Sequence, residues 1–248
     1  MLEKMKNRRT VRKYTNQDVS KELLNELLSV ACRASTTGNM QLYSIVVTRG
    51  DENKEKLAPA HFNQPMVRQA PVVLTFCADY NRFVKWCELR NAEPGYDNLQ
   101  SFMAAVMDSL LAAQTFCTAA EEAGLGICYL GTTTYNAPQI IEALNLPKRV
   151  VPVITVTVGY PDGDTEQVER LPLEAIVHEE AYRDYAAADI DRLYAEKESL
   201  PANIRFVEEN NKETLAQVFT DIRYTRKNNE YFSEVFMEVL KKQGFLHQ

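Results

Sequence analysis

The sequence predicts an α+β protein in which a small sheet is flanked by helices. Three segments rich in β-branched and other apolar residues have the pattern of buried strands: Tyr43–Thr48, Pro71–Ala78 and "VVPVITVTVGYP" (Val150–Pro161). Helical patterns separate these strands, and the stretch after Pro161 contains helical patterns only. We therefore expect one domain over residues 1–248, with a helical C-terminal extension from about 180 to 248.

The N-terminal part predicts a short helix, a basic segment and a second helix. Ser20 is a suitable N-cap, and an apolar stripe of helical spacing follows it at Leu23, Leu24, Leu27, Leu28 and Ala31. The segment "STTGNMQ" (Ser35–Gln41) then ends the helix with small polar residues and a glycine. Another helix, starting near Asp51 or Glu52, is expected between the first two strands.

A long helix is predicted from about Asn98 to Ala123, with Gly124 as the residue that ends it. It is apolar around most of its circumference and rich in alanine, so it must be covered on every side. Two interpretations remain open: the central helix of one domain, or a helix packed against a second subunit. Asp108 and Gln114 interrupt the apolar run, which favours a buried helix over a membrane span.

The segment "GLGICYLGTTTYN" predicts a short strand over Ile127–Leu130, followed by Gly131 and a threonine cluster. Asn136 is then expected to cap a helix that runs to Leu144. The last helix has one apolar face and is closed by Gly244. That face consists of Phe232, Val235, Phe236, Val239 and Leu240.

Composition excludes several classes of protein. A net charge of −6 argues against a general nucleic-acid binder. The N-terminus has charges but no apolar segment behind them, so no signal peptide is expected. Five scattered cysteines without a CxxC pair fit a reducing compartment. We expect a soluble cytoplasmic protein without a membrane partner.

The usual motifs of catalysis are missing. His61, His178 and His247 have no metal-ligand spacing, so we expect structural roles for them and no metal site. There is no GxSxG, GxxxxGK[ST] or GxGxxG motif, and "GLGICYLG" has the wrong glycine spacing for a phosphate loop. The chain is therefore either not an enzyme or an enzyme whose cofactor carries the chemistry.

The segment "NRRTVRKYT" (Asn7–Thr15) concentrates positive charge in an acidic chain. Six of the 28 Lys and Arg residues lie within the first thirteen positions. If the segment is extended, Arg8, Thr10 and Arg12 share a face and form a phosphate receptor of two guanidinium groups and a hydroxyl. Arg9 then faces the other way, toward a ring or a ribityl chain. The alternative interpretation is a solvated basic arm.

Five segments in order resemble the FMN-dependent nitroreductase superfamily, in particular its oxygen-insensitive NAD(P)H nitroreductases and NADPH–flavin reductases. They are "RRTVRKYT", "ASTTGNMQ", "NQPMVRQAPVVLTFCADY", "AGLGICYLGTT" and "ERLP", and "KKQGF" near the C-terminus also fits. The resemblance covers essentially the whole chain. It implies a nitroreductase-like fold with a mostly antiparallel central sheet and an intertwined homodimer that binds FMN at the subunit interface.

The resemblance also implies a set of cofactor-binding residues. Those expected at the phosphate and part of the flavin are Arg8, Arg9, Thr10, Arg12 and Arg170. Those expected from the partner subunit are Ser35, Thr36 and Asn39. Gln64, or alternatively Asn63, matches the contact to the pyrimidine edge. Tyr129, Leu130, Gly131 and Thr132 match the residues against the ring and ribityl chain. Val168 replaces a family lysine, which removes one expected phosphate contact.

The implied activity is two-electron reduction of nitroaromatics, quinones or similar small acceptors by NAD(P)H in a ping-pong cycle, with no catalytic side chain because the flavin carries the chemistry. The first alternative is a flavin reductase that supplies free reduced FMN. A further alternative makes residues 180–230 a substrate lid. Separately, Lys212 or Arg223 is either a contact to the 2′-phosphate of NADPH or part of a solvated helical face. A different class is a non-enzymatic protein that binds an anion or a nucleic acid.

Overall fold

The computed structural model describes residues 2–246, so His247 lies outside the described part. The chain forms two compact units. One contains the residues up to Gln167 together with those from Phe232 onward, and the other is Val168–Tyr231. The last part of the expected C-terminal extension, from Phe232, therefore belongs with the sheet, and its first part belongs to the second unit.

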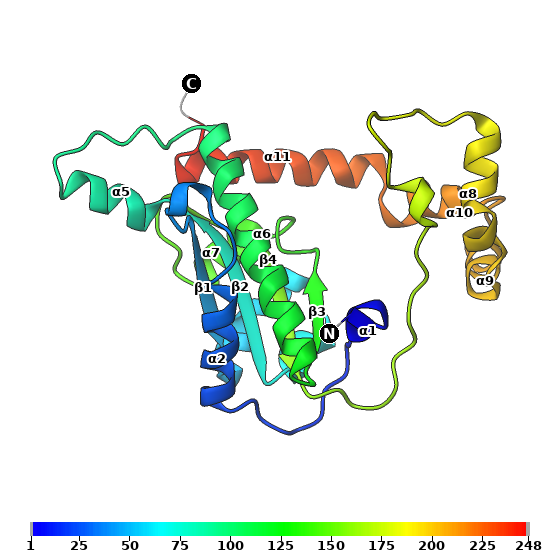
Figure 1. Ribbon diagram of the computed structural model, residues 1–248, viewed down its shortest axis with the longest axis horizontal. Helices are drawn as coiled ribbons and strands as arrows, with labels where there is room; N and C mark the ends of the chain where they lie inside the picture. Colours follow the sequence, from blue (N-terminus) through cyan, green and yellow to red (C-terminus); the bar gives the residue numbers. More distant parts are fainter. Residues whose placement is uncertain (1, 247–248) are drawn as a thin grey trace. The chain divides into compact units, whose positions relative to one another are not determined.

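A four-stranded antiparallel sheet is the centre of the first unit (Figure 1). Its strands are β1 (Tyr43–Thr48), β2 (Val72–Asp79), β3 (Gly126–Leu130) and β4 (Val150–Gly159), in the spatial order β1-β2-β4-β3. All eight residues of β2 are buried, because helices cover both faces of the sheet. The predicted α+β class, with its antiparallel sheet flanked by helices, is confirmed.

Helices α2 (Lys21–Ala31) and α6 (Leu99–Glu122) cover one face of the sheet. Side chains that alternate along β2, Leu74 and Phe76, pack against Phe116 of α6. The α6 helix is long and apolar enough to cross a membrane by length and composition alone. Its contacts with all four strands identify it as the central helix of this unit.

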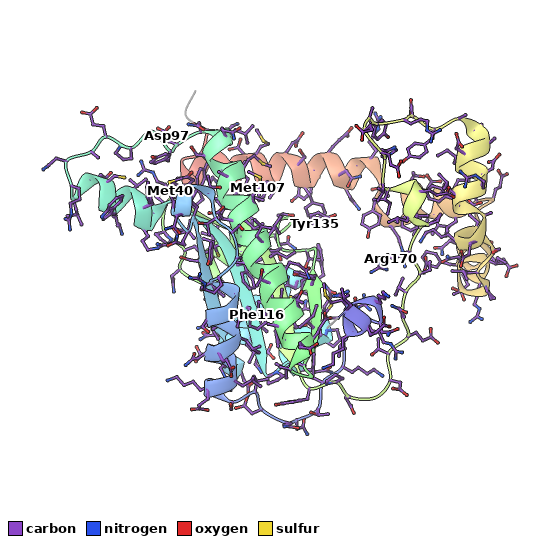
Figure 2. All side chains as sticks on the ribbon, viewed as in Figure 1. Met40, Asp97, Met107, Phe116, Tyr135 and Arg170 are labelled. Carbon is purple, nitrogen blue, oxygen red and sulfur yellow. The ribbon has the colours of Figure 1, made fainter. Side chains whose placement is uncertain are left out.

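A stripe of large apolar side chains on α6 does not face the sheet. It consists of Leu99, Met103, Met107, Leu110 and Leu111, each 43–52% exposed. Figure 2 marks Met107 and the buried Phe116 on the same helix. Both interpretations of the alanine-rich helix therefore keep support: it is central in its own unit, and it has an apolar face left over.

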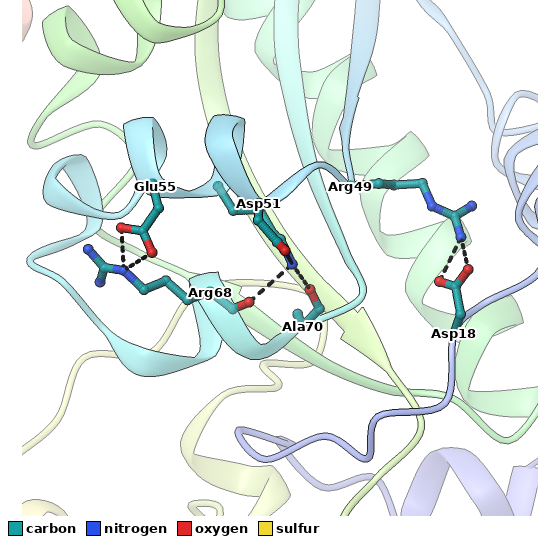
Figure 3. Close-up of polar contacts among 7 residues, drawn as sticks. Asp18, Arg49, Asp51, Glu55, Arg68 and Ala70 are labelled. Carbon is teal, nitrogen blue, oxygen red and sulfur yellow. Dashed lines mark hydrogen bonds and ion pairs between the residues drawn. The ribbon is translucent and has the colours of Figure 1, made fainter.

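The opposite face of the sheet is covered by α3 (Asp51–Leu57), η2 (Pro59–His61), α4 (Pro65–Gln69) and α7 (Ala137–Ala143). The buried Lys54 fastens α3 to α4, because its ammonium donates to the carbonyl oxygens of Arg68 (3.1 Å) and Ala70 (3.3 Å). Its charge is balanced by Asp51 at 2.9 Å (Figure 3). These bonds satisfy carbonyl groups at the end of α4 and fix the loop that precedes it.

Three further helices complete the first unit: α1 (Leu2–Lys6), α5 (Asn81–Glu88) and the C-terminal part of α11 (Arg226–Gln243). Phe102 of α6 packs against Phe236 and Phe245, with ring centroids 5.9 and 5.3 Å apart. Gly244 has a φ of 84°, as expected for the glycine that ends a helix.

The second unit holds η3 (Leu173–Ala175), α8 (Ala187–Ser199), α9 (Pro201–Glu209), α10 (Leu215–Val218) and η4 (Phe219–Arg223). Lys212 pairs with Asp221 at 2.9 Å, and the guanidinium of Arg223 lies 4.4 Å from the ring centre of Phe206. Both cations therefore have partners within their own unit, which favours a structural role for them over a contact with NADPH.

Candidate functional site

The basic segment (Asn7–Thr15) runs beside β3, near the residues that begin this strand. The N–H of Val11 donates to the carbonyl of Ile127 (3.0 Å), and the N–H of Thr15 donates to that of Tyr160 (2.9 Å). Gly126 makes this approach possible, since a Cβ at that position would lie 2.6 Å from the Cβ of Val11. One glycine of "GLGICYLG" thus serves close packing of the basic segment on the strand.

The cations of this segment have different surroundings. Arg8 pairs with Glu121 near the end of α6 at 3.2 Å, with both side chains largely buried. Burial raises the pKa of the Glu121 carboxyl, and Arg8 lowers it. Arg9 and Lys13 are exposed and have no ion-pair partner within residues 2–246.

Arg12 is exposed, and it follows Val11, whose N–H bonds to β3. Burial raises the pKa of the Cys128 thiol, whereas the charges of Arg12 and Arg8 and a hydrogen bond from Arg12 lower it. The charges of both guanidinium groups therefore act on this thiol, and the common face of Arg8 and Arg12 stays a prediction. Thr10, between them, is half-buried.

The loop around Gln64 lies across from the basic segment. A cavity of about 560 Å³ is lined on one side by Arg12, Lys13 and Tyr14, and on the other by Pro65 and Met66. Gln64 immediately precedes this wall; it is half-buried, and its side chain has no partner in the described chain. The alternative residue, Asn63, accepts a hydrogen bond from Arg68 at 3.0 Å, so Gln64 is the more available of the two.

The third part of the site is the end of β3 and the turn after it. Tyr129 points toward α6, where its hydroxyl donates to Gln114 Oε1 at 3.2 Å, and burial raises its pKa. Leu130 points to the opposite face and is buried. The side chains of these two predicted residues are thus committed to packing, because successive strand residues face opposite sides.

The turn after β3 begins with Gly131 and Thr132, which are less buried than Leu130. Gly131 is exposed, and no atom would lie within 4 Å of an added Cβ. In the part of the chain that the structure describes, the backbone N–H groups of both residues lack a hydrogen-bond partner. The Thr132 hydroxyl lies 2.8 Å from Nδ1 of His61. The turn therefore offers backbone donors, while the hydroxyl of Thr132 is occupied by its contact with His61.

The segment that carries Ser35, Thr36 and Asn39 lies elsewhere in the chain. It forms η1 (Thr37–Asn39), and Asp108 of α6 holds it by accepting from Thr37 N–H (2.8 Å) and Oγ1 (2.9 Å). Arg8 contacts α6 at Glu121, thirteen residues further on, which is about 20 Å along a helix axis. A single chain therefore brings together the basic segment, the Gln64 loop and the Gly131 turn, but not the Ser35 segment.

Arg170 belongs to the second unit, and Figure 2 labels it. Its guanidinium donates to the carbonyl oxygens of Val168 (3.2 Å) and Glu169 (2.9 Å), next to it in sequence. Glu169 itself pairs with Lys197 at 2.5 Å, and this contact lowers its pKa. These local bonds do not test the expected contact of Arg170 with a phosphate, which stays a prediction.

Sequence reasoning missed three residues that shape the site: Asp108, Glu121 and His61. Asp108 is 1% exposed and also accepts from the N–H of Leu42 at 3.1 Å. A carboxylate inside an apolar helix needs hydrogen-bond donors, and this signal was visible in the sequence. Glu121 and His61 gave no such signal, because their partners are distant in sequence.

Known proteins resemble the chain over its full length. The Nitroreductase family model matches residues 5–160. A solved structure of a protein from Bacteroides fragilis is 65% identical, covers 99% of this chain and 100% of its own, and has a TM-score of 0.98. A protein of Bacillus subtilis named FMN reductase [NAD(P)H] is 30% identical over 99% of this chain and 97% of its own. A Cr(VI) reductase from a Pseudomonas species is 34% identical over 73% of this chain and 74% of its own.

The antiparallel sheet with its covering helices and the cation-rich edge of β3 define a nitroreductase-like protein. The chain belongs to the nitroreductase family. The resemblance inferred from five short motifs is thereby confirmed at the level of the family and the fold.

Proposed function

We propose that this protein is an FMN-dependent NAD(P)H oxidoreductase that reduces nitroaromatics, quinones or similar small acceptors by two electrons. Relatives with FMN reductase and Cr(VI) reductase names support this class of activity. The observation that carries the proposal is the proximity of cations and backbone N–H groups, both without partners in the described residues, at one edge of the sheet. Val11, next to Arg12, donates to the carbonyl of Ile127, and Gly131 lies four residues after Ile127, about 13 Å along a strand.

The residues fit the phosphate end of FMN. Arg9 and Lys13 are exposed cations without an ion-pair partner in the described residues, so each is available to an anion. Arg12 and Thr10 would supply a guanidinium and a hydroxyl on the same segment. Arg8 would add a second guanidinium, whose charge Glu121 already balances in part. The family resemblance adds Arg170 as a further phosphate contact.

The residues also fit the flavin ring. Gln64 would bond the pyrimidine edge, and the N–H groups of Gly131 and Thr132 would face the ring from the turn. Tyr129 and Leu130 would contribute through their backbone, because their side chains pack on opposite faces of β3. When bound, FMN accepts a hydride from NAD(P)H and passes two electrons to the acceptor, so no side chain has to act as acid or base.

Two features of the chain support a homodimer with FMN at the subunit interface. The Ser35 segment is separated from Arg8 by about 20 Å along α6, so Ser35, Thr36 and Asn39 would reach the flavin only from a second subunit. The apolar stripe of α6 that includes Met103 and Met107 is a surface such a subunit would cover. We place this dimer in the cytoplasm, without nucleic-acid or membrane partners.

A flavin reductase that releases reduced FMN is the alternative, and the full-length similarity to an FMN reductase favours keeping it. The two activities differ in one measurement. A flavin reductase consumes free FMN as a substrate with saturation kinetics, whereas a nitroreductase turns over nitroaromatics without dissociation of its flavin. A non-enzymatic anion or nucleic-acid binder would show neither activity.

The visible absorption spectrum of the purified protein tests the proposal. We expect a yellow flavin spectrum, or its appearance after addition of FMN, that bleaches on anaerobic addition of NADPH or NADH. Reoxidation by a nitroaromatic or a quinone then identifies the acceptor class. A colourless protein that binds no added FMN would overturn the proposal, and the cations of the basic segment would require another ligand.

A further inference from the structure

His61 is the buried polar residue that the proposed function does not yet use. It ends η2, has no exposed surface, and lies against the apolar cluster that contains Leu130 and Met66. Its Nδ1 is 2.8 Å from Thr132 Oγ1, and its Nε2 is buried without a partner in the described chain. An unpaired buried nitrogen is costly, so packing alone does not account for an imidazole here.

The contact to Thr132 is one of two bridges between the same pair of segments. Asn136, at the other end of the turn, donates from Nδ2 to the carbonyl of Ala60 at 2.8 Å. The N–H of Asn136 in turn donates to the carbonyl of Thr132 at 3.3 Å. The turn after β3 is therefore fastened at both ends to residues 60 and 61.

Thr133 closes the turn by donating to the carbonyl of Leu130 from its N–H (3.3 Å) and its hydroxyl (2.8 Å), and the donors of Gly131 and Thr132 lie within this turn. Gly131 has open space around its Cα, and its N–H and that of Thr132 are unpaired in the described residues. A glycine in such a turn has wide conformational freedom. The contact of the Thr132 hydroxyl with His61 is the side-chain contact that the two residues carrying these donors make in the described chain.

The same histidine also contacts the Gln64 loop. The N–H of Gln64 donates to the backbone carbonyl of His61 at 3.1 Å. His61 thus connects the residue expected at the pyrimidine edge with the turn expected against the ring. Burial lowers the pKa of His61 to about 4, so the ring stays neutral near neutral pH and the contact with Thr132 persists.

We propose that His61 is a positioning residue for the flavin site, which holds the backbone N–H groups of Gly131 and Thr132 toward the ring through the Thr132 hydroxyl. This inference rests on the proposed function. It assigns His61 no direct contact with the cofactor and no part in proton transfer.

The test compares FMN affinity of reconstituted apoprotein among variants of both partners. His61→Ala removes the contact, whereas His61→Asn keeps a polar atom near the position of Nδ1. Thr132→Val removes the hydroxyl at constant shape, and Thr132→Ser keeps it. We expect the first member of each pair to weaken FMN binding roughly five- to tenfold, the effect of one lost hydrogen bond, and the second to stay near wild type.

The double variant His61→Ala/Thr132→Val distinguishes positioning from direct contact. If His61 acts through Thr132, the double variant binds FMN no more weakly than either single one. The spectrum of bound FMN should shift equally in all three. Additive losses would mean that the Thr132 hydroxyl contacts FMN independently, which overturns the inference.

Apoprotein melting temperatures are the control for a purely structural role. A lowered melting temperature with unchanged FMN affinity and an unchanged flavin spectrum would also overturn the inference. If His61→Ala does not fold, Thr132→Val and its serine control still give the comparison. A wild-type protein that binds no FMN would instead refute the proposed function at the first step, before any variant is compared.

Discussion

The carboxylate of Asp108 accepts two hydrogen bonds from Thr37, one from its backbone N–H at 2.8 Å and one from its hydroxyl at 2.9 Å. Thr37 begins the short η1 turn, in which Gly38 and Asn39 both have positive φ. A residue in the middle of α6 thereby fixes a loop with an unusual backbone. The expected partner-side residues Ser35, Thr36 and Asn39 depend on it for their position.

Replacement of Asp108 by Asn is expected to destabilise the protein. The amide keeps one acceptor oxygen, but its NH₂ group replaces the other oxygen and faces a group that now donates a hydrogen bond to the carboxylate. One lost charge-assisted bond in this buried site costs about 2–3 kcal/mol. The melting temperature should then fall by roughly 5–10 °C. Glu93→Gln, at an exposed position without a partner in the described chain, is the control for the charge change. Equal stability of the Asp108→Asn protein would contradict the structural role.

Arg8 is expected to contribute to FMN affinity despite its pairing with Glu121. Arg8→Met should weaken FMN binding about 10- to 100-fold, the range for a lost charge-assisted contact. Glu121→Gln should tighten it several-fold, because the guanidinium is no longer shared. Fluorescence quenching of FMN measures both affinities. Lys21→Gln, an exposed cation on α2, controls for net charge. Unchanged affinity in Arg8→Met would assign Arg8 to the ion pair alone.

The stability of the protein is expected to decrease in mild acid because of His61. Its pKa is lowered by burial from 6.5 to about 4, so the unfolded state binds more protons between these values. The contribution of His61 is therefore fully present above about pH 6.5 and is lost as the pH falls toward 4, by up to about 1.4 kcal/mol per pH unit. Thermal unfolding of wild type and His61→Asn between about pH 7 and pH 5 measures it. Parallel curves for the two proteins would argue against a neutral buried histidine.

The apolar stripe of α6 is expected to hold two subunits together. Met107→Glu places a charge in the middle of the stripe and should convert the dimer to monomers in sedimentation velocity. FMN binding should be lost with it, because the Ser35 segment then no longer reaches the site. Val30→Glu, at an exposed position on α2, is the matched control. A wild-type protein that sediments as a monomer would contradict the dimer directly.

Much of the fold followed from local sequence patterns. Runs rich in β-branched and apolar residues placed the strands, and Ser20, Asn98 and Gly124 marked helix ends correctly because caps act within a few residues. The spacing of "RRTVR" indicates a common face for Arg8 and Arg12, which stays a prediction. These features depend on covalent geometry and neighbours along the chain, which a sequence displays.

Only the tertiary structure decided which of these segments meet. The pairing of Arg8 with Glu121, of Thr37 with Asp108 and of His61 with Thr132 joins residues 71 or more positions apart. No local pattern encodes such contacts, because they depend on the strand order β1-β2-β4-β3 and on the length of α6. The sequence by itself determined the family, the elements and the chemical groups available to a flavin. The packing of α6 across the sheet decided that the Ser35 segment and the basic segment contact this helix about 20 Å apart, at Asp108 and at Glu121, because a helix is rigid and rises about 1.5 Å per residue.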